Sequence, residues 1–217
     1  MKLHNFNLSS ASFRVRIALN LKGLGYDYVS YVLRRGDQRG EGFLQLNPQG
    51  LVPALELDDG TVLMQSMAII EYLDEAHPNP PLLPRSPLAR ARVRAIAQAI
   101  ACDIHPLNNL RVLKYLAKPL DLAEETRDEW YRHWVRTGFD GLEPQLAGSP
   151  ETGRFCHGDG PTQADICLVP QVTNAMRFNC DLTPYPTIRR IYEACMALPT
   201  FQEAAPDRQP EATAAQP

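Results

Sequence analysis

Hydroxyl side chains gather near the beginning of the sequence, directly before a stretch with helical periodicity. Ser9, Ser10 and Ser12 are followed by Arg14 and Arg16 in the segment NLSSASFRVRIALN. A serine directly before a helix accepts a hydrogen bond from a backbone N–H that lacks a partner within the helix, and such a cap needs no further function. The same turn also offers hydroxyl groups and the positive end of the helix dipole to an anion. Because a free thiol has a pKa of about 8.5, contacts of this kind would increase the reactive fraction of a bound thiol at neutral pH.

Val52 and Pro53 stand at the start of a predicted strand, in the segment GLVPALE. Proline cannot donate to the hydrogen-bond ladder of a sheet, so one explanation is that this strand lies at an edge. The other is a cis peptide bond, which turns the chain sharply. In that case the N–H and C=O of Val52 would point outward and could pair with an extended, peptide-like ligand as an added strand. The sequence supports both explanations.

A further hydroxyl group precedes another predicted helix. Ser66, in the segment MQSMAIIEYL, has the position of an N-cap, and Gln65 comes directly before it. Capping alone explains this serine. The alternative is a binding site in which the carboxylate of a ligand lies at the helix N-terminus, with Gln65 and Ser66 as hydrogen-bond donors.

Polar side chains also gather in the segment DIHPLNNLRV. His105 and Asn109 are four residues apart and share a helical face, with Asn108 and Arg111 close by. No second histidine or carboxylate stands at an offset that suits a metal ion, so no metal site is predicted. Most such clusters are solvated faces or helix–helix hydrogen bonds. Because a proline is expected to kink this helix, the alternative is that the cluster lines a cleft between two domains, where ligand sites tend to form.

Arg177 is a lone arginine among apolar neighbours in the segment NAMRFNCDLTPYP. One explanation is a structural partner within the protein. The other is that its guanidinium holds the carboxylate of a substrate through two parallel hydrogen bonds.

The overall composition excludes several classes of protein. The chain has 217 residues and a formal net charge of −3, which gives no reason to expect nucleic acid or an anionic membrane as a partner. Its apolar runs are far shorter than a membrane span, and the start MKLHNFNLSS lacks the apolar core of a signal peptide. A cytoplasmic protein is therefore predicted.

The five cysteines all lie after residue 101, without CxxC or metal-type spacing. They are interpreted as small buried hydrophobic residues in a reducing compartment.

The first 77 residues alternate strand and helix patterns, which predicts a small layered α/β domain. An Asp-Gly turn between two apolar runs predicts a hairpin within it. The expected elements are strands at 2–6 and 26–33, a helix over 15–23 that Gly23 ends, a hairpin over 52–64, and a helix from about Ser66 to Pro78.

Five prolines in the segment HPNPPLLPRSP, residues 77–87, indicate a linker. Strand patterns nearly vanish after it. Helices are expected over 88–117 with a kink near Pro106, and over 123–148, 165–178 and 187–198. Thr162 and Asp165 form an acidic variant of a capping box at the third of these helices. The domains are therefore predicted as 1–77, a linker over 78–87, and an all-helical domain over 88–217 whose tail after Phe201 is loosely ordered at its end.

In their order and spacing, these segments resemble the zeta class of the glutathione transferase superfamily, whose members include maleylacetoacetate and maleylpyruvate isomerases. The resemblance covers nearly the whole chain and is based on SSASFRVRIALNLKG, LNPQGLVPAL, QSMAIIEYL, DIHPLNNLRVLKYL, PTQADICLVPQV, RFNCDLTPYPTI and APDRQP. It implies a thioredoxin-like N-terminal domain that binds glutathione and a helical C-terminal domain that lines the substrate site. It also implies a homodimer.

The resemblance assigns roles to individual residues. Ser9 and Ser10 would reach the glutathione sulfur, Val52 before Pro53 would pair with the glutathione backbone, and Gln65 and Ser66 would hold its γ-glutamyl carboxylate. The residues expected to complete the tripeptide site or the substrate pocket are Gln38, His105, Asn109 and Arg111. Arg177 is the main candidate for a substrate carboxylate, with Arg14 and Arg111 as further candidates. Thr162 and Asp165 match a structural capping box of the family.

Three positions depart from the family pattern. Ala11 stands where the zeta motif usually has a cysteine, which argues against a reductive dehalogenase that needs a protein thiol. Phe13 replaces the usual tryptophan. Leu8 stands where the isomerases often have an arginine, and this removes one anchor for a dicarboxylate.

The implied reaction is cis–trans isomerisation of a maleyl double bond, in the catabolism of aromatic compounds. Addition of a thiolate turns the double bond into a single bond, with charge spread into an enolate; rotation and expulsion of the thiolate then follow. Glutathione is regenerated and acts as a cofactor. The alternatives are a general transferase that conjugates glutathione to electrophiles, and a non-catalytic glutathione-binding or regulatory protein on the same fold.

Overall fold

The computed structural model describes residues 1–213. Contacts within the chain divide the described residues into two compact units. The first unit contains residues 1–82 and 197–213, and the second contains residues 83–196. The boundary between Leu82 and Leu83 lies within the proline-rich segment that the sequence indicates as a linker.

The first unit is built on a four-stranded mixed sheet in the order β2-β1-β3-β4. The strands are β1 (Lys2–Asn5), β2 (Asp27–Ser30), β3 (Ala54–Glu56) and β4 (Val62–Met64). β1 pairs with β2 in parallel, whereas β3 is antiparallel to both β1 and β4. In this register Leu3 lies opposite Tyr28 on one side and Leu55 on the other. The predicted hairpin is confirmed, with Gly60 at φ +85 in its turn.

Two helices of this unit, α1 (Ser10–Leu21) and α3 (Ser66–Ala76), pack against each other. The side chains of Phe13, Ile17, Leu55 and Ile70 are completely buried or nearly so and contribute to its core. The connection between β2 and β3 contains the short helices η1 (Asp37–Arg39) and α2 (Glu41–Leu46), which the sequence patterns do not predict.

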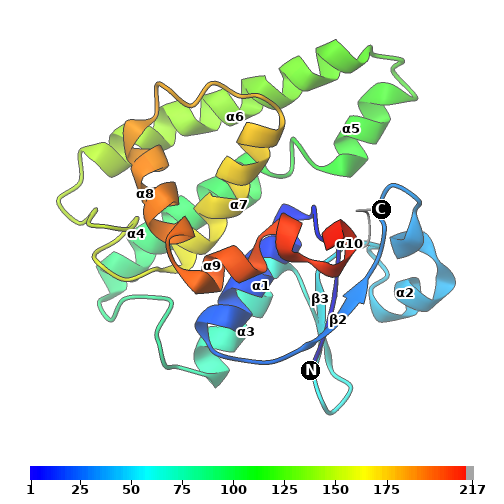
Figure 1. The fold of residues 1–217 in the computed structure, drawn as a ribbon, viewed down its shortest axis with the longest axis horizontal. Helices are drawn as coiled ribbons and strands as arrows, with labels where there is room; N and C mark the ends of the chain where they lie inside the picture. The colour runs from blue at the N-terminus through cyan, green and yellow to red at the C-terminus, as the bar shows by residue number, and fades with distance from the viewer. Residues whose placement is uncertain (214–217) are drawn as a thin grey trace. The chain divides into compact units, whose positions relative to one another are not determined.

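The segment after residue 196 belongs to the first unit rather than to the helical one. It contains α9 (Pro199–Ala204), η3 (Pro206–Arg208) and α10 (Pro210–Thr213), and Figure 1 shows α9 beside α1. The side chain of Arg16 donates to the carbonyl of Ala204, and that of Asn20 to the carbonyl of Thr200. These bonds explain why the helical unit ends at residue 196 and does not extend over 88–217 as expected. The predicted loose end of the tail falls on residues 214–217, outside the described residues.

The second unit is helical, and its described residues 83–196 contain no strand. Its helices are α4 (Pro87–Gln98), the π-helix η2 (Ala99–Ile104), α5 (Leu110–Ala117), α6 (Glu124–Ala147), α7 (Gln163–Arg177) and α8 (Pro186–Met196). α7 packs against α4 and α8. The predicted capping box is confirmed, because Asp165 accepts hydrogen bonds from the N–H and the hydroxyl of Thr162.

The expected kinked helix over 88–117 is instead two separate helices joined by residues 105–109. The last π-turn closes with the N–H of His105 donating to the carbonyl of Ile100. Pro106 has no N–H to continue the ladder, so the chain leaves the helix and starts a new one after Asn109. Within the described residues, no helix is long and apolar enough to cross a membrane.

Candidate functional site

The serine turn joins β1 to α1. Ser9 is the N-cap, with φ −75 and ψ 115, and its Oγ accepts a hydrogen bond from the N–H of Ser12 at 3.2 Å. The capping role predicted for this turn is thus confirmed. Because a hydroxyl has one donor and two acceptor sites, accepting this bond leaves the O–H of Ser9 able to donate to an anion. Ser10 is the first helical residue and is 5% exposed.

The peptide bond between Val52 and Pro53 is cis. The strand that follows, β3, lies between β1 and β4, so the explanation by an edge strand is wrong. Among the described residues, neither the N–H nor the C=O of Val52 forms a hydrogen bond with another backbone group. Both groups are therefore suited to pair with an extended ligand.

The N-cap of α3 is Gln65, and Ser66 is the first helical residue, which corrects the prediction of Ser66 as the cap. Gln65 has φ +70, a conformation that residues other than glycine rarely adopt, and its Nε2 donates to Oε1 of Gln49 at 2.9 Å. Strained backbone of this kind is concentrated at binding sites. Ser66 is 7% exposed, and its Oγ accepts a hydrogen bond from Nη1 of Arg14 at 3.4 Å.

Arg14 links the two helices that begin at the serine turn and at Ser66. Its side chain is only 1% exposed within α1, and its guanidinium reaches the hydroxyl at the start of α3. This burial favours a role in supporting Ser66 over the expected contact with a substrate carboxylate.

Gln38 lies in the short helix η1, and its Oε1 is buried without a hydrogen-bond partner among the described residues. A buried amide oxygen without a partner is costly, and a ligand N–H would satisfy it. Beside it, the N–H of Val32 donates to Asp37 and is the main reason why the pKa of that carboxyl is lowered.

In the helical unit, three of the predicted residues meet at the start of α5. Asn109 is the N-cap, and its Oδ1 accepts a hydrogen bond from the N–H of Arg111 at 3.1 Å. Its Nδ2 lies 3.4 Å from Nε2 of His105. The side chain of Arg111 is exposed. The side chains of His105 and Asn109 are therefore close together as expected, but across the turn between two helices and not on one helical face.

Arg177 is the last residue of α7 and is exposed. Its guanidinium carbon lies 5.4 Å from the centre of the Phe178 ring. That ring stacks on Tyr131 of α6, with centroids 3.7 Å apart and planes within 6° of parallel. Sequence reasoning missed these two aromatic residues, since nothing in the local pattern pairs positions so distant along the chain.

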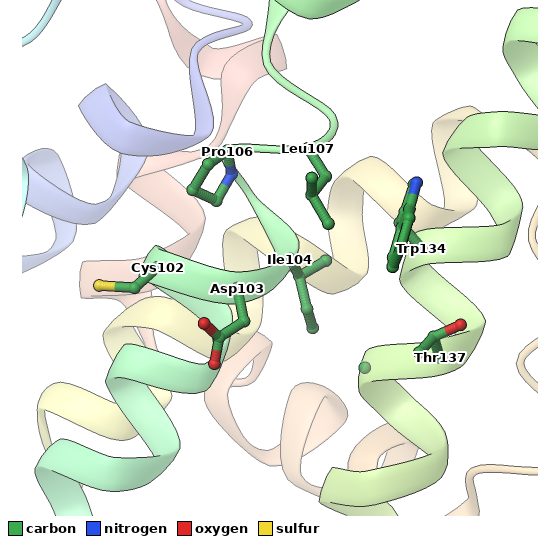
Figure 2. A pocket seen from close by; sticks show the side chains of 8 residues that line it. Cys102, Asp103, Ile104, Pro106, Leu107, Trp134 and Thr137 are labelled. Atoms are coloured by element: carbon green, nitrogen blue, oxygen red, sulfur yellow. The ribbon is translucent and has the colours of Figure 1, made fainter.

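A cavity of about 380 Å³ lies within the helical unit, between η2 and α6 (Figure 2). Ile104 and Pro106, on either side of His105 in sequence, contribute to its lining together with Trp134 of α6. The remaining lining residues are Cys102, Asp103, Leu107, Thr137 and Gly138. Gly138 permits the close approach of the π-helix, because a Cβ there would lie 2.2 Å from Cδ1 of Ile104.

None of the five cysteines, which all lie within the described residues, forms a disulfide bond. Cys156, Cys167 and Cys195 are buried, as expected, whereas Cys180 is part-buried and Cys102 is exposed, which corrects the interpretation for Cys102. Burial raises the pKa of the Cys180 thiol to about 11, and it also raises the pKa of the Cys156 thiol well above its ordinary value. Within residues 1–213, no group of histidine, cysteine and carboxylate side chains is arranged to hold a metal ion.

Comparison with known proteins places the chain among its relatives. Residues 8–76 match the family model of the glutathione S-transferase N-terminal domain. The chain is 50% identical to a maleylpyruvate isomerase of Ralstonia sp., over 97% of this chain and 99% of the relative. A solved holo structure of a maleylpyruvate isomerase, described as a bacterial zeta-class glutathione S-transferase, matches with a TM-score of 0.96 and 50% identity over 98% of this chain and all of the other.

A second solved structure is the maleylacetoacetate isomerase of Methylobacterium extorquens AM1 with bound malonate and glutathione. It matches with a TM-score of 0.95 and 46% identity over 98% of this chain and 99% of the other. With half of its residues identical over almost its full length, and with the sheet and helices described above, the chain belongs to the zeta-class glutathione transferase family of maleylacetoacetate and maleylpyruvate isomerases.

Proposed function

We propose that this protein is a glutathione-dependent cis–trans isomerase of maleyl-type dicarboxylates, such as maleylpyruvate or maleylacetoacetate. The observation that supports it most strongly is that two helices of the first unit begin with a serine hydroxyl group, Ser9 before α1 and Ser66 at the start of α3. The chain is also 50% identical to a maleylpyruvate isomerase. Each N-terminus is a site where backbone N–H groups and the helix dipole favour an anion.

The residues of the first unit fit glutathione. The N-terminus of α3, with Gln65 and Ser66, offers donors for the γ-glutamyl carboxylate. The main chain of Val52 has both a donor and an acceptor for the peptide backbone, and the buried Oε1 of Gln38 needs a donor that a peptide N–H supplies. In the helical unit, we assign His105, Asn109 and Arg111 to the remainder of the tripeptide or to the substrate.

When bound, glutathione supplies a thiolate that adds to the alkene and leaves again after rotation about the former double bond. The hydroxyl of Ser9 or Ser10 and the N-terminal end of α1 stabilise the negative charge on sulfur and so lower the pKa of the thiol. The protein's own buried thiols, with raised pKa values, are poor substitutes for this nucleophile.

We assign the substrate carboxylate to Arg177. Its guanidinium is exposed at the end of α7 and rests against Phe178, which is itself held by Tyr131. A guanidinium fixed in this way can bind a carboxylate through two parallel hydrogen bonds. We further propose that the protein is a cytoplasmic homodimer that acts in the catabolism of aromatic compounds.

The test follows both the substrate and glutathione. Calorimetry should show binding of glutathione, and maleylpyruvate or maleylacetoacetate should be converted to its fumaryl isomer while the glutathione concentration stays constant. Consumption of glutathione with formation of an adduct would instead support a general conjugating transferase. This is the main alternative, because Leu8 stands where the isomerases often have an arginine that would anchor a dicarboxylate. Absence of glutathione binding would refute the proposal.

A further inference from the structure

We propose that Arg16 and Glu211 together position the serine turn, so that the last described helix of the chain determines how well the turn stabilises the glutathione thiolate. Arg16 binds the carbonyl of Asn7 and Glu211 binds its N–H, and we call this pair of residues the Asn7 clamp. This inference rests on the proposed function, because it assigns the turn a thiolate to stabilise.

Arg16 forms the first half of the clamp. It is completely buried in α1, and its Nη2 donates to the carbonyl of Asn7 at 3.0 Å, while its Nη1 donates to the carbonyl of Phe6 at 3.3 Å. Its Nε donates to the carbonyl of Ala204 at 2.9 Å. Burial lowers the pKa of this guanidinium to about 10, so it keeps its charge at neutral pH. Glu211 is among the groups whose interaction opposes that shift.

Glu211 of α10 forms the second half. Its Oε1 accepts a hydrogen bond from the N–H of Asn7 at 3.3 Å, across 204 positions of sequence. Both oxygens of this carboxylate are also bound to β2, through the hydroxyls of Tyr28 at 2.7 Å and Ser30. The carboxylate is therefore held on the strand and presented to the turn.

The clamp lies two residues before Ser9 and fixes both polar groups of the Asn7 main chain. The N–H of Ser9 donates to the carbonyl of Phe6 at 3.0 Å, so an oxygen that Arg16 holds also orients the backbone of Ser9. The side chain of Asn7 adds a bond to the carbonyl of Pro206 at 3.4 Å. A hydroxyl stabilises a thiolate only within a narrow range of distance and angle, so loss of the clamp weakens that contact without removing any group from it. Arg16 and Glu211 are thus positioning residues.

The experiment compares Glu211→Ala with Glu203→Ala, which removes an exposed carboxylate from α9 in the same segment. Three quantities are measured: the pKa of the bound glutathione thiol from its ultraviolet thiolate absorbance, the pH profile of turnover, and the hydrogen exchange of the Ser9 amide without glutathione. We expect Glu211→Ala to raise the thiol pKa by roughly one pH unit. At pH values below the thiol pKa, the fraction of thiolate and therefore the turnover should fall about tenfold. Exchange at Ser9 should become faster. Glu203→Ala should leave all three quantities unchanged.

Tyr28→Phe provides a milder variant in case Glu211→Ala does not fold. It removes the hydrogen bond from the hydroxyl of Tyr28 to the carboxylate of Glu211. It should raise the thiol pKa and speed the hydrogen exchange of the Ser9 amide, each by less than Glu211→Ala does. The inference is overturned if a folded variant loses stability but keeps the thiol pKa and the Ser9 exchange of the unmodified protein. Failure of the unmodified protein to bind glutathione would refute the proposed function, whereas the exchange measurement would still decide whether the clamp orders the turn.

Discussion

Ser9 and Ser66 hold different positions at the starts of their helices, although the sequence predicts both as caps. Ser9 is a true N-cap, whereas Ser66 is the first helical residue behind Gln65. The local sequence could not reveal this difference. Serine is the favoured cap residue, while Gln65 at φ +70 adopts a conformation that its own propensity opposes and that the surrounding structure must impose. The kind of site is predictable from the sequence, but the role of each hydroxyl is not.

Replacing Ser66 with alanine is expected to weaken glutathione binding at least tenfold. The hydroxyl is a donor for a charged carboxylate, and a charge-assisted hydrogen bond contributes about 1.5–3 kcal/mol. Calorimetry measures the effect. Ser86→Ala is the control, because Ser86 caps α4 in the other unit with a bond from the N–H of Ala89 at 3.2 Å. That variant should lose about 1 kcal/mol of stability and keep its affinity. Equal affinities for the two variants would contradict the assignment of Ser66.

Ser9→Ala and Ser10→Ala separate capping from activation of the thiol. Loss of the cap in Ser9→Ala should cost about 1 kcal/mol of unfolding free energy, whereas Ser10→Ala should cost less, since Ser10 lies inside the helix. Removing a hydroxyl that stabilises the bound thiolate should raise the thiol pKa, because hydrogen bonding favours the charged form. We expect the larger shift for Ser9→Ala. If both variants are less stable but titrate like the unmodified protein, the turn is a cap only.

At the scale of elements, helices with long periodic patterns are predicted well and irregular ones are not. The α6 helix and the hairpin of β3 and β4 follow from apolar periodicity and an Asp-Gly turn. The α2 helix has only six residues, fewer than two turns, and therefore shows no readable period. The π-helix η2 depends on packing against α6, where Gly138 leaves room for Ile104, and no local signal records a contact between the two helices.

Gly138→Ala is expected to destabilise the helical unit by about 1–3 kcal/mol, the usual cost of overpacking a core. The added Cβ would lie 2.2 Å and 2.3 Å from two side-chain carbons of the buried Ile104. Gly141→Ala is the matched control on the same helix, since its Cβ meets nothing within 4 Å. It should gain about 0.5–1 kcal/mol from helix propensity. Urea unfolding measures both variants.

A double-mutant cycle tests the physical reason. In an Ile104→Ala background, Gly138→Ala should cost much less than in the unmodified protein, because the clashing carbons are gone. An unchanged cost in that background would show that Ile104 is not the obstacle.

At the scale of the whole molecule, the sequence predicts two units and a proline-rich boundary but not the return of the chain to the first unit. The buried side chains of Phe201 and Ala204 belong to that unit although they follow the helical one. No local pattern indicates this, because the carbonyl of Ala204, which accepts from Nε of Arg16, is 188 positions away.

A protein consisting of residues 1–82 alone is therefore expected not to fold cooperatively. It lacks Phe201, whose removal from a core costs about 3–5 kcal/mol, and it leaves the buried Nε–H of Arg16 without its acceptor, the carbonyl of Ala204. Such losses approach the whole stability of a small domain, which is about 5–15 kcal/mol. Circular dichroism during urea titration measures the outcome. A fusion of residues 1–82 to 197–217 through a flexible linker should restore a cooperative transition, and cooperative unfolding of residues 1–82 alone would contradict this account.

The distance along the chain between Asn7 and Glu211 also sets an order of events during synthesis. A ribosome adds about 5–20 residues each second, so Glu211 is made roughly 10–40 s after Asn7. The serine turn and α1 are made early in that interval, whereas the carboxylate that fixes the turn is made only at its end. A nascent chain therefore cannot acquire its thiol-activating geometry early. A chain terminated before residue 211 would retain Ser9, but the turn that carries Ser9 would lack the carboxylate of Glu211.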